Sequence, residues 1–366
     1  MVKFHFIALI TLVLSQTVKA QNTFDSHVRG SSTKNEFFQW AQRPADLRSG
    51  VYQQATDHMG HLPGATFGQR YWISSQFATK GPQSPVIFHI CGEGDVDQAY
   101  FLNDNALAWA EQLGAHVVFL EHRYYGRSLP FQDLSTEHLR YLTLDNVLED
   151  LASFQRWMVS QGLQGPWISI GGSYSGTLSA LYRQKHPELV VGALASSAPM
   201  ISGLGQFDDA TSDLESLSSL DPSSDTGDRQ WVYQACTTFG FWEADGPSAN
   251  ANLEIPSPGL CRKLFGSIGM VNSASYNQKY NAPFLSASDL APSNIFFTYG
   301  SDDVWTQLGL VRESIQNSRI AVEVIAGAGH HFDLNAPDAN DSEAVLQARL
   351  DFVSLAQKWM ISALRF

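Results

Sequence analysis

The sequence has no hydrophobic run long enough to form a membrane-spanning helix. A bilayer core needs about 20 consecutive apolar residues, whereas the apolar run from Phe4 to Leu14 is much shorter. Lys3 precedes this run, and the small residues around Lys19 follow it. We therefore interpret residues 1–20 as a cleaved signal peptide and expect a secreted, periplasmic or lysosomal protein without stable membrane insertion.

Basic residues are scarce. The chain has 23 Lys and Arg against 36 Asp and Glu, which gives a formal net charge of −13. Removal of residues 1–20 would take away two further positive charges, Lys3 and Lys19. An acidic surface repels polyanions, so we expect no nucleic-acid partner and no binding to anionic membranes.

Cysteine is also rare, with only three residues in the chain. Cys236 and Cys261 are the more plausible disulfide pair, because Cys91 lies in an apolar run typical of a buried strand. Three buried free thiols remain the alternative, since spacing alone does not define pairing. No His or Cys cluster has the spacing of metal ligands, so we predict no metal and no cofactor.

The apolar residues that are present follow an alternating strand and helix pattern. Strands are predicted at 86–90, 117–120, 167–170 and 190–195, and helices at 106–113 and 144–158. This alternation is typical of an α/β protein with a mainly parallel sheet covered on both faces.

The pattern stops at Pro199 and resumes with a strand at 295–299. Residues 202–288 are rich in Ser, Asp, Gly and Pro and lack the alternation, so we predict an inserted cap there. The main domain then comprises residues 21–201 and 289–366. It closes with a last strand at 320–325 and an amphipathic helix at 344–364.

Ser173 lies where a predicted strand changes into a helix, in the sequence Gly171-Gly-Ser-Tyr-Ser-Gly176. A nucleophile elbow needs small residues around its serine, because the strand turns sharply into the helix there. Ser175 stands where the usual Gly-x-Ser-x-Gly pattern has its last glycine. Taken alone, the stretch fits an elbow or an ordinary Gly/Ser-rich turn.

Two later loops contain the residues that would activate this serine. Asp303 follows the strand at 295–299, and His330 follows the strand at 320–325. The order Ser, Asp, His is that of α/β-hydrolases, in which the histidine takes the serine proton and the carboxylate orients the histidine. We predict the triad Ser173, Asp303 and His330, with the adjacent His331 as the alternative base.

Attack by a serine creates an oxyanion, which backbone N–H groups stabilise. The expected donors are the amide of Tyr174, which follows the nucleophile, and the amide of Gly92, in the turn after the strand at 86–90.

Several longer motifs resemble one family of serine exopeptidases, which includes lysosomal Pro-X carboxypeptidase and dipeptidyl peptidase II. The similarity runs from about Val51 to the C-terminus. The motifs that carry it are Phe67-Gly-Gln-Arg-Tyr71, Glu93-Gly-Asp95, Glu121-His-Arg-Tyr-Tyr-Gly126, Ser128-Leu-Pro130, Gly171-Gly-Ser-Tyr174, Cys236-Thr-Thr-Phe-Gly-Phe241 and His330-His-Phe-Asp-Leu334.

The resemblance implies an α/β-hydrolase domain with a mostly helical cap. It also implies cleavage of peptide substrates after proline or a small residue near a chain end. Family members usually have glycine where Ser175 stands. We expect this departure to affect the turn or the floor of the pocket. The sequence leaves open whether a dipeptide or a single C-terminal residue is released, and it leaves the oligomeric state open, a homodimer included.

A proline-binding pocket needs flat apolar walls, because proline has a rigid ring and no N–H to pair. Trp305 is our first candidate for a wall, and Phe239, Phe241 and Trp242 are candidates from the cap. Ordinary core packing is the alternative for these aromatic residues. Glu93 could bind a substrate ammonium group, or it could be a buried structural carboxylate.

Two other functions are compatible with the same fold. A secreted esterase or lipase would use an identical triad, and a non-catalytic binding protein would retain only the fold. The presence of all three triad residues argues against the second. Cap aromatic residues beside an acidic loop suit peptides better than long acyl chains.

Overall fold

The computed structural model describes residues 46–96, 104–207, 217–222, 227–245, 254–255, 258–288, 291–310 and 315–363. Within these ranges, the side chains of 204–207, 242–245 and 254–255 are not described. The predicted signal peptide at residues 1–20 lies outside the described residues.

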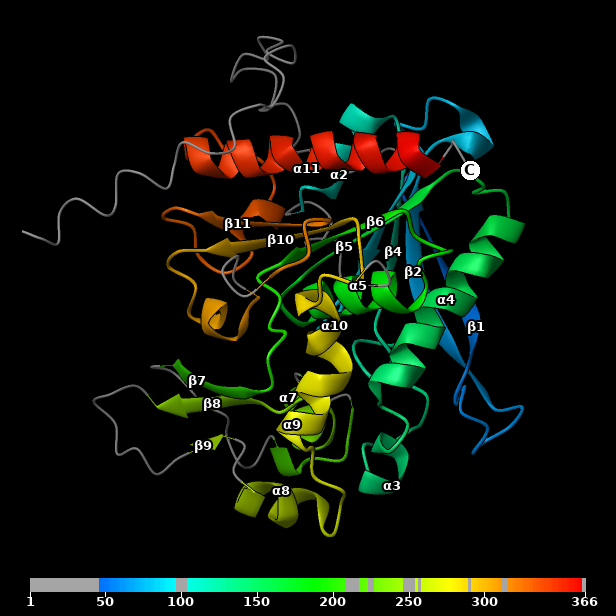
Figure 1. Cartoon of the computed structure of the whole chain (residues 1–366). Coiled ribbons are helices and arrows are strands. Elements are labelled where there is room, and N and C mark those ends of the chain that lie inside the picture. Colours follow the sequence, from blue (N-terminus) through cyan, green and yellow to red (C-terminus); the bar gives the residue numbers. More distant parts are fainter. Residues whose placement is uncertain are drawn as a thin grey trace, which may run out of the picture.

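An eight-stranded sheet with the order β1-β2-β4-β3-β5-β6-β10-β11 forms the centre of the protein (Figure 1). β2 is antiparallel to both β1 and β4, and every other neighbouring pair is parallel. The strands are β1 (Arg48–Ala55), β2 (Thr66–Ser74), β3 (Val86–Ile90), β4 (His116–Leu120), β5 (Trp167–Gly172), β6 (Gly192–Ser196), β10 (Ile295–Gly300) and β11 (Ile320–Ile325). The predicted mainly parallel sheet of an α/β-hydrolase is confirmed.

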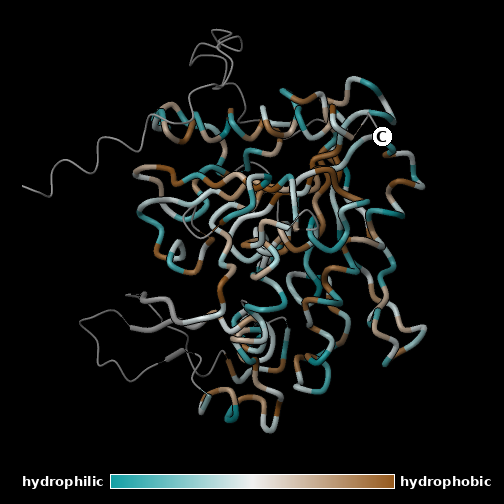
Figure 2. The backbone as a smooth tube through the Cα atoms, viewed as in Figure 1, coloured by the Kyte–Doolittle hydropathy of each residue, from teal (hydrophilic) through white to brown (hydrophobic). Residues whose placement is uncertain are grey.

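Helices cover both faces of this sheet, because side chains alternate between the faces along each strand. In β3, Val86 and Phe88 join one hydrophobic cluster, whereas Ile87 joins the other. The first cluster packs against α4 (Leu144–Ser160) and α5 (Ser173–Lys185), and the second against α2 (Ala106–Leu113) and α11 (Glu343–Ala363). Figure 1 shows α2 and α11 on one side of the sheet and α4 and α5 on the other. Hydrophobic residues gather along the central strands (Figure 2).

A local signal explains where α4 begins. The Thr143 side chain accepts a hydrogen bond of 3.2 Å from the amide of Asn146, so it caps the start of α4. After β10, the chain forms a short 3₁₀ turn, Val304–Leu308. Asp303 caps this turn through the amide of Trp305.

The cap, residues 202–288, lies between β6 and β10. Its helical elements are α7 (Asp228–Gln234), the π-helical turn Ala235–Phe239, α8 (Pro258–Phe265), α9 (Ser273–Tyr276), a second π-helical turn, Asn277–Asn281, and α10 (Ala282–Leu285). It also contains a three-stranded sheet of β7 (Gly203–Phe207), β8 (Phe241–Asp245) and β9 (Glu254–Ile255), which the sequence did not predict. Figure 1 shows this small sheet apart from the main one.

No helix within the described ranges is both long enough and apolar enough to cross a bilayer. The parallel strands β3, β5, β10 and β11 bring the loops that follow them to one edge of the main sheet. This edge, beyond the carboxyl ends of the strands, is where α/β proteins bind ligands.

Candidate active site

Ser173 occupies a sharp turn between β5 and α5. Its φ of 55° lies in the left-handed region, which non-glycine residues rarely adopt. A Cβ on Gly171 would lie 2.3 Å from the carbonyl oxygen of Ser175, and a Cβ on Gly176 would lie 2.8 Å from that of Ser196. The glycines are therefore required by close backbone approach, as in a nucleophile elbow.

Ser175 closes this turn with its own hydroxyl. Its Oγ donates to the carbonyl of Gly172 at 2.7 Å and accepts from the amide of Gly172 at 3.1 Å. The serine in place of the usual glycine thus satisfies two backbone groups directly before the nucleophile position. It also contributes to the lining of the adjacent cavity.

Asp303 and His330 form a hydrogen-bonded pair. The Nδ1 of His330 lies 2.9 Å from Oδ1 of Asp303, whose side chain is fully buried. Because a carboxylate can only accept, Nδ1 carries the proton, and Nε2 is left able to take one from a nucleophile.

The Asp303 carboxyl remains ionised in spite of its environment. Burial acts to raise its pKa, but the hydrogen bond and charge of His330, the Ser197 hydroxyl and the Trp305 amide together lower it below the usual value. A charged Asp303 holds the imidazole in one tautomer and stabilises the imidazolium that forms during acyl transfer.

Ser173 and His330 line the same cavity, which has a volume of about 710 Å³. Its other described lining residues are His89, Gly92, Glu93, Gly94, Asp95, Val96, Asp104, Gly172, Ser175, Gly227, Asp228, Trp231, Trp305, His331, Leu334 and Asn335. The cavity therefore joins the three predicted loops of the main domain to α7 of the cap.

His331 differs from His330 in its partners. Its amide donates to the Ser197 hydroxyl at 2.8 Å, and its ring packs so closely on Gly172 that a Cβ there would lie 3.0 Å from His331 Cγ. Burial and the charge of His330 lower the pKa of His331. The hydrogen bond to Asp303 favours His330 as the base.

Gly92 and Tyr174 lie beside Ser173, as expected for oxyanion donors. Gly92 lines the cavity, and a Cβ on it would be 3.7 Å from Ser175 Oγ. Tyr174 is the second residue of α5, and its side chain is buried beneath the cap. Their roles as donors remain a prediction, which the proximity supports.

Of the predicted substrate-binding residues, the structure places two at the cavity. Glu93 and Trp305 line it, and burial raises the pKa of Glu93 to about 7, against the opposing effects of its own backbone amide and the His330 charge. Phe239 and Phe241 are instead buried in the core, where their rings stack with centroids 4.6 Å apart. The side chain of Trp242 lies outside the described part of the structure.

The expectation that Phe239 and Phe241 form pocket walls is corrected by this placement. Both side chains pack against other aromatic rings instead of facing the cavity. Phe239 contacts Tyr174, and Phe241 contacts Tyr276. The cap supplies Trp231 to the cavity instead. The sequence carries no signal that separates Trp231 from the other cap aromatic residues.

Two further residues of the cavity were missed. The Nε2 of His89 lies 2.7 Å from Oδ2 of Asp104, and both line the cavity. His89 stands as a polar residue within the apolar run of β3. That exception was the available signal, because a histidine in a buried strand needs a polar partner.

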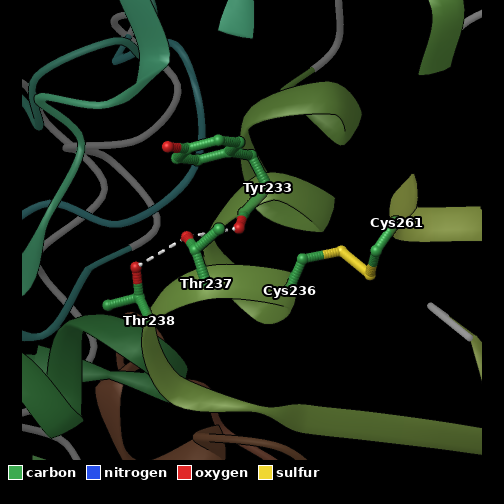
Figure 3. The surroundings of a disulfide bond; sticks show 5 residues. All are labelled: Tyr233, Cys236, Thr237, Thr238 and Cys261. Carbon is green, nitrogen blue, oxygen red and sulfur yellow. Dashed lines mark hydrogen bonds between the residues drawn. A yellow bond between two sulfur atoms is a disulfide. The ribbon is translucent and has the colours of Figure 1, made fainter. Parts of the chain in front are cut away.

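A disulfide joins Cys236 and Cys261, two cap residues that are 25 positions apart in the sequence (Figure 3). The predicted pairing is confirmed, and Cys91 is buried and takes no part in this disulfide. The bond ties the π-helical turn after α7 to α8, so it stabilises the part of the cap next to Trp231. Among the residues that the structure describes, no group of three or more His, Cys, Asp or Glu could hold a metal ion.

The sequence also matches the profile of a known protein family. The sequence profile of the family described as Serine carboxypeptidase S28 matches residues 54–211 and 205–351. Lysosomal Pro-X carboxypeptidase from Homo sapiens is 42% identical over 166 residues, which cover 43% of this chain and 32% of that protein. The Bos taurus protein of the same name is 37% identical over 212 residues, covering 55% and 41%. The chain thus aligns with less than half the length of these relatives.

Solved structures of esterases are among those that resemble this one. A structure described as an arylesterase has a TM-score of 0.47 at 11% identity and covers 88% of this chain and 89% of its own. The carboxylesterase EstE1 also has a TM-score of 0.47, at 13% identity, covering 89% and 92%. At this distance the similarity says nothing about substrate.

Proposed function

The chain belongs to the serine carboxypeptidase S28 family, and on that premise we propose that it is a serine exopeptidase acting through an acyl-enzyme. It hydrolyses peptides after proline, or after alanine or another small residue, near a chain end. The observation that carries this proposal is the Asp303–His330 hydrogen bond in the cavity that Ser173 also lines.

Ser173 and His330 act together in the proposed reaction. Ser173 Oγ attacks the scissile carbonyl carbon while His330 Nε2 accepts its proton. The carbonyl oxygen becomes an oxyanion, which the amides of Tyr174 and Gly92 stabilise. His330 then donates the proton to the leaving amine, and water releases the acyl group by the same steps.

Charge in the cavity favours release of an N-terminal dipeptide over removal of a C-terminal residue. Four carboxylates line it, and no Lys or Arg is present among its described lining residues; the carboxylates belong to Glu93, Asp95, Asp104 and Asp228. Such a lining attracts a substrate ammonium and repels a terminal carboxylate. Glu93 is the best-placed partner for the ammonium, because it follows Gly92 directly.

Two indole side chains support a preference for proline. Trp305 comes from the main domain and Trp231 from the cap, and both line the cavity beside the triad. Flat aromatic surfaces can pack against a pyrrolidine ring without needing a backbone hydrogen bond from it.

We also infer that the protein is exported. The relatives above are named as lysosomal proteins, and the Cys236–Cys261 disulfide suits an oxidising compartment. Sequencing the N-terminus of the recovered protein should find a start near Gln21. A mature chain that retains residues 1–20 would contradict export by cleavage.

The proposed activity can be tested with matched substrates. Wild type and Ser173→Ala are compared on Xaa-Pro and Xaa-Ala dipeptidyl amides, on peptides ending in Pro-Xaa, and on short and long acyl esters. We expect the free-amine dipeptidyl amides to be cleaved by wild type alone. Turnover of long-chain esters with all peptides untouched would contradict the peptidase proposal, and cleavage of only the Pro-Xaa ends would contradict the N-terminal mode.

A further inference from the structure

Gln234, the last residue of α7, connects the cap to the residue that follows the nucleophile. It is fully buried, and its Nε2 donates to the Tyr174 hydroxyl at 2.8 Å. Its Oε1 accepts from the Tyr125 hydroxyl at 2.7 Å. A cap side chain is thus bonded both to α5, which starts with Ser173, and to the loop after β4.

The hydrogen bonds continue beyond Tyr174 in one direction. The Nδ1 of His122 lies 2.6 Å from the carbonyl oxygen of Arg123, so this nitrogen carries a proton. Burial lowers the pKa of His122 to about 4, although that hydrogen bond opposes the shift. The ring is therefore neutral at ordinary pH, and its Nε2 accepts from the Tyr174 hydroxyl at 3.2 Å.

These hydrogen bonds form a relay of four side chains, Tyr125, Gln234, Tyr174 and His122, in which each bond runs in one direction. Tyr125 donates to Gln234, Gln234 to Tyr174, Tyr174 to His122, and His122 to a backbone carbonyl. A buried network whose members are hydrogen-bonded fixes side-chain positions, whereas loss of one member leaves its neighbours unpaired.

The ring of Tyr174 is also held by the cap. Its centroid lies 5.2 Å from that of Phe239 and 5.9 Å from that of Trp231. Trp231 lines the cavity, so α7 both forms a wall of the active site and holds Tyr174.

We propose that Gln234 is a positioning residue. Through its hydrogen bond to the Tyr174 hydroxyl, it links the position of the cap to the position of the Tyr174 amide in the oxyanion hole. The inference rests on the proposed function, because it takes the Tyr174 amide as an oxyanion donor. A donor acts only on the transition state, and small displacements of it reduce the rate strongly. Loss of the relay should therefore lower kcat and leave KM nearly unchanged.

The direct test is Tyr174→Phe, which removes the hydroxyl and keeps the ring and the amide. We expect kcat to fall roughly tenfold, less than the loss of an entire oxyanion donor, with KM within about twofold. Gln234→Leu should give a similar decrease. The double variant should be no slower than the worse single variant, because both substitutions break one relay.

Tyr276→Phe is the matched control. Tyr276 is buried in the same hydrophobic cluster, but its hydroxyl has no hydrogen-bond partner among the described residues. Removing this hydroxyl should leave kcat and KM at their wild-type values. A decrease equal to that of Tyr174→Phe would overturn the inference, since it would reflect only the loss of a buried oxygen.

A fluorophosphonate probe separates this inference from the proposed function, because it modifies an activated serine whatever the natural substrate is. Tyr174→Phe and Gln234→Leu should slow its reaction with Ser173, measured by intact-protein mass, and Tyr276→Phe should not. Wild type that reacts with the probe but cleaves no peptide would contradict the proposed function alone. Normal kcat and probe reaction in folded Tyr174→Phe would contradict this inference alone.

Gln234→Met provides a second variant in case Gln234→Leu or Tyr174→Phe does not fold. Methionine keeps the length of the side chain, and its thioether can accept weakly from Tyr125, but it has no N–H to donate to Tyr174. We expect the same decrease in kcat. A lower melting temperature with unchanged kcat would show that the relay is only structural and would overturn the inference.

Discussion

The main domain and the cap contribute to the active site in different ways. In the main domain, Ser173, Asp303 and His330 stand on loops fixed by hydrogen-bonded parallel strands. The cap contributes Asp228, Trp231 and Gln234 from one short helix, α7, which packing, the relay and the nearby disulfide hold in place. The difference suggests that the main domain performs the chemistry and the cap adjusts recognition and alignment.

The largest effect should come from removing the nucleophile in the main domain. Ser173→Ala or His330→Ala should lower kcat by about a millionfold, leaving the contributions of binding and the oxyanion hole. Steady-state kinetics on an Xaa-Pro amide measures this. Turnover near the wild-type rate in either variant would remove these residues from the proposed triad.

Asp303→Asn should have the next largest effect, because an amide can donate to His330 and so stabilise the wrong tautomer. We expect kcat to fall by about 10⁴-fold. Asp302→Asn is the matched control, since Asp302 is exposed and is bonded to the Ser301 hydroxyl. Equal losses in the two variants would contradict the assignment of Asp303.

Glu93→Gln tests the acidic lining of the cavity. A charge-assisted hydrogen bond contributes about 1.5–3 kcal/mol, so kcat/KM for free-amine substrates should fall about tenfold to hundredfold at pH 8. Substrates with a blocked N-terminus should be affected little. A loss of equal size on blocked substrates would indicate a structural carboxylate instead.

The pKa of about 7 also predicts the pH dependence of this effect. Glu93 is neutral below that pH and binds an ammonium poorly, so the penalty of Glu93→Gln should vanish as the pH falls below about 7. The stability of the fold changes in the other direction with pH. The pKa of Glu93 in the folded protein lies above the value of 4.5 for an unperturbed glutamate, so the stability that Glu93 contributes at low pH is lost as the pH rises through about 7. Glu93→Gln should therefore unfold at a higher temperature than wild type at neutral pH.

The smallest effect is expected from the cap. Trp231→Leu should raise KM for Xaa-Pro substrates about tenfold, which corresponds to about 1.4 kcal/mol of lost contact, with a smaller change in kcat. Trp157→Leu is the control, because Trp157 packs against Phe154 and Tyr52 and none of the three lines the cavity. If both variants change KM equally, Trp231 has no particular role in binding.

The same contrast explains how much the sequence could predict. In the main domain, the predicted strand at 86–90 and helix at 106–113 coincide with β3 and α2. Strand and helix periodicity directly reflects burial on a two-sided sheet, and the loop order then brings Ser173, Asp303 and His330 to one edge. The hydrogen bond between Asp303 and His330 follows from that arrangement.

Cap contacts depend on long-range packing that no local pattern records. Phe239 and Trp231 are both aromatic cap residues, yet only Trp231 reaches the cavity. Gln234 resembles any polar helix residue in the sequence, and its relay needs Tyr125 and Tyr174 from distant segments. The small sheet β7-β8-β9 was missed for the same reason, because its segments are short and separated.

The most direct test of the central claim is to trap the acyl-enzyme. Wild type would be mixed with an activated ester of a free-amine Xaa-Pro dipeptide, quenched in acid during turnover, digested and analysed by mass spectrometry. We predict a dipeptidyl adduct on Ser173 that is absent from Ser173→Ala. An adduct on another residue, or none while the ester is still hydrolysed at the wild-type rate by Ser173→Ala, would contradict the account.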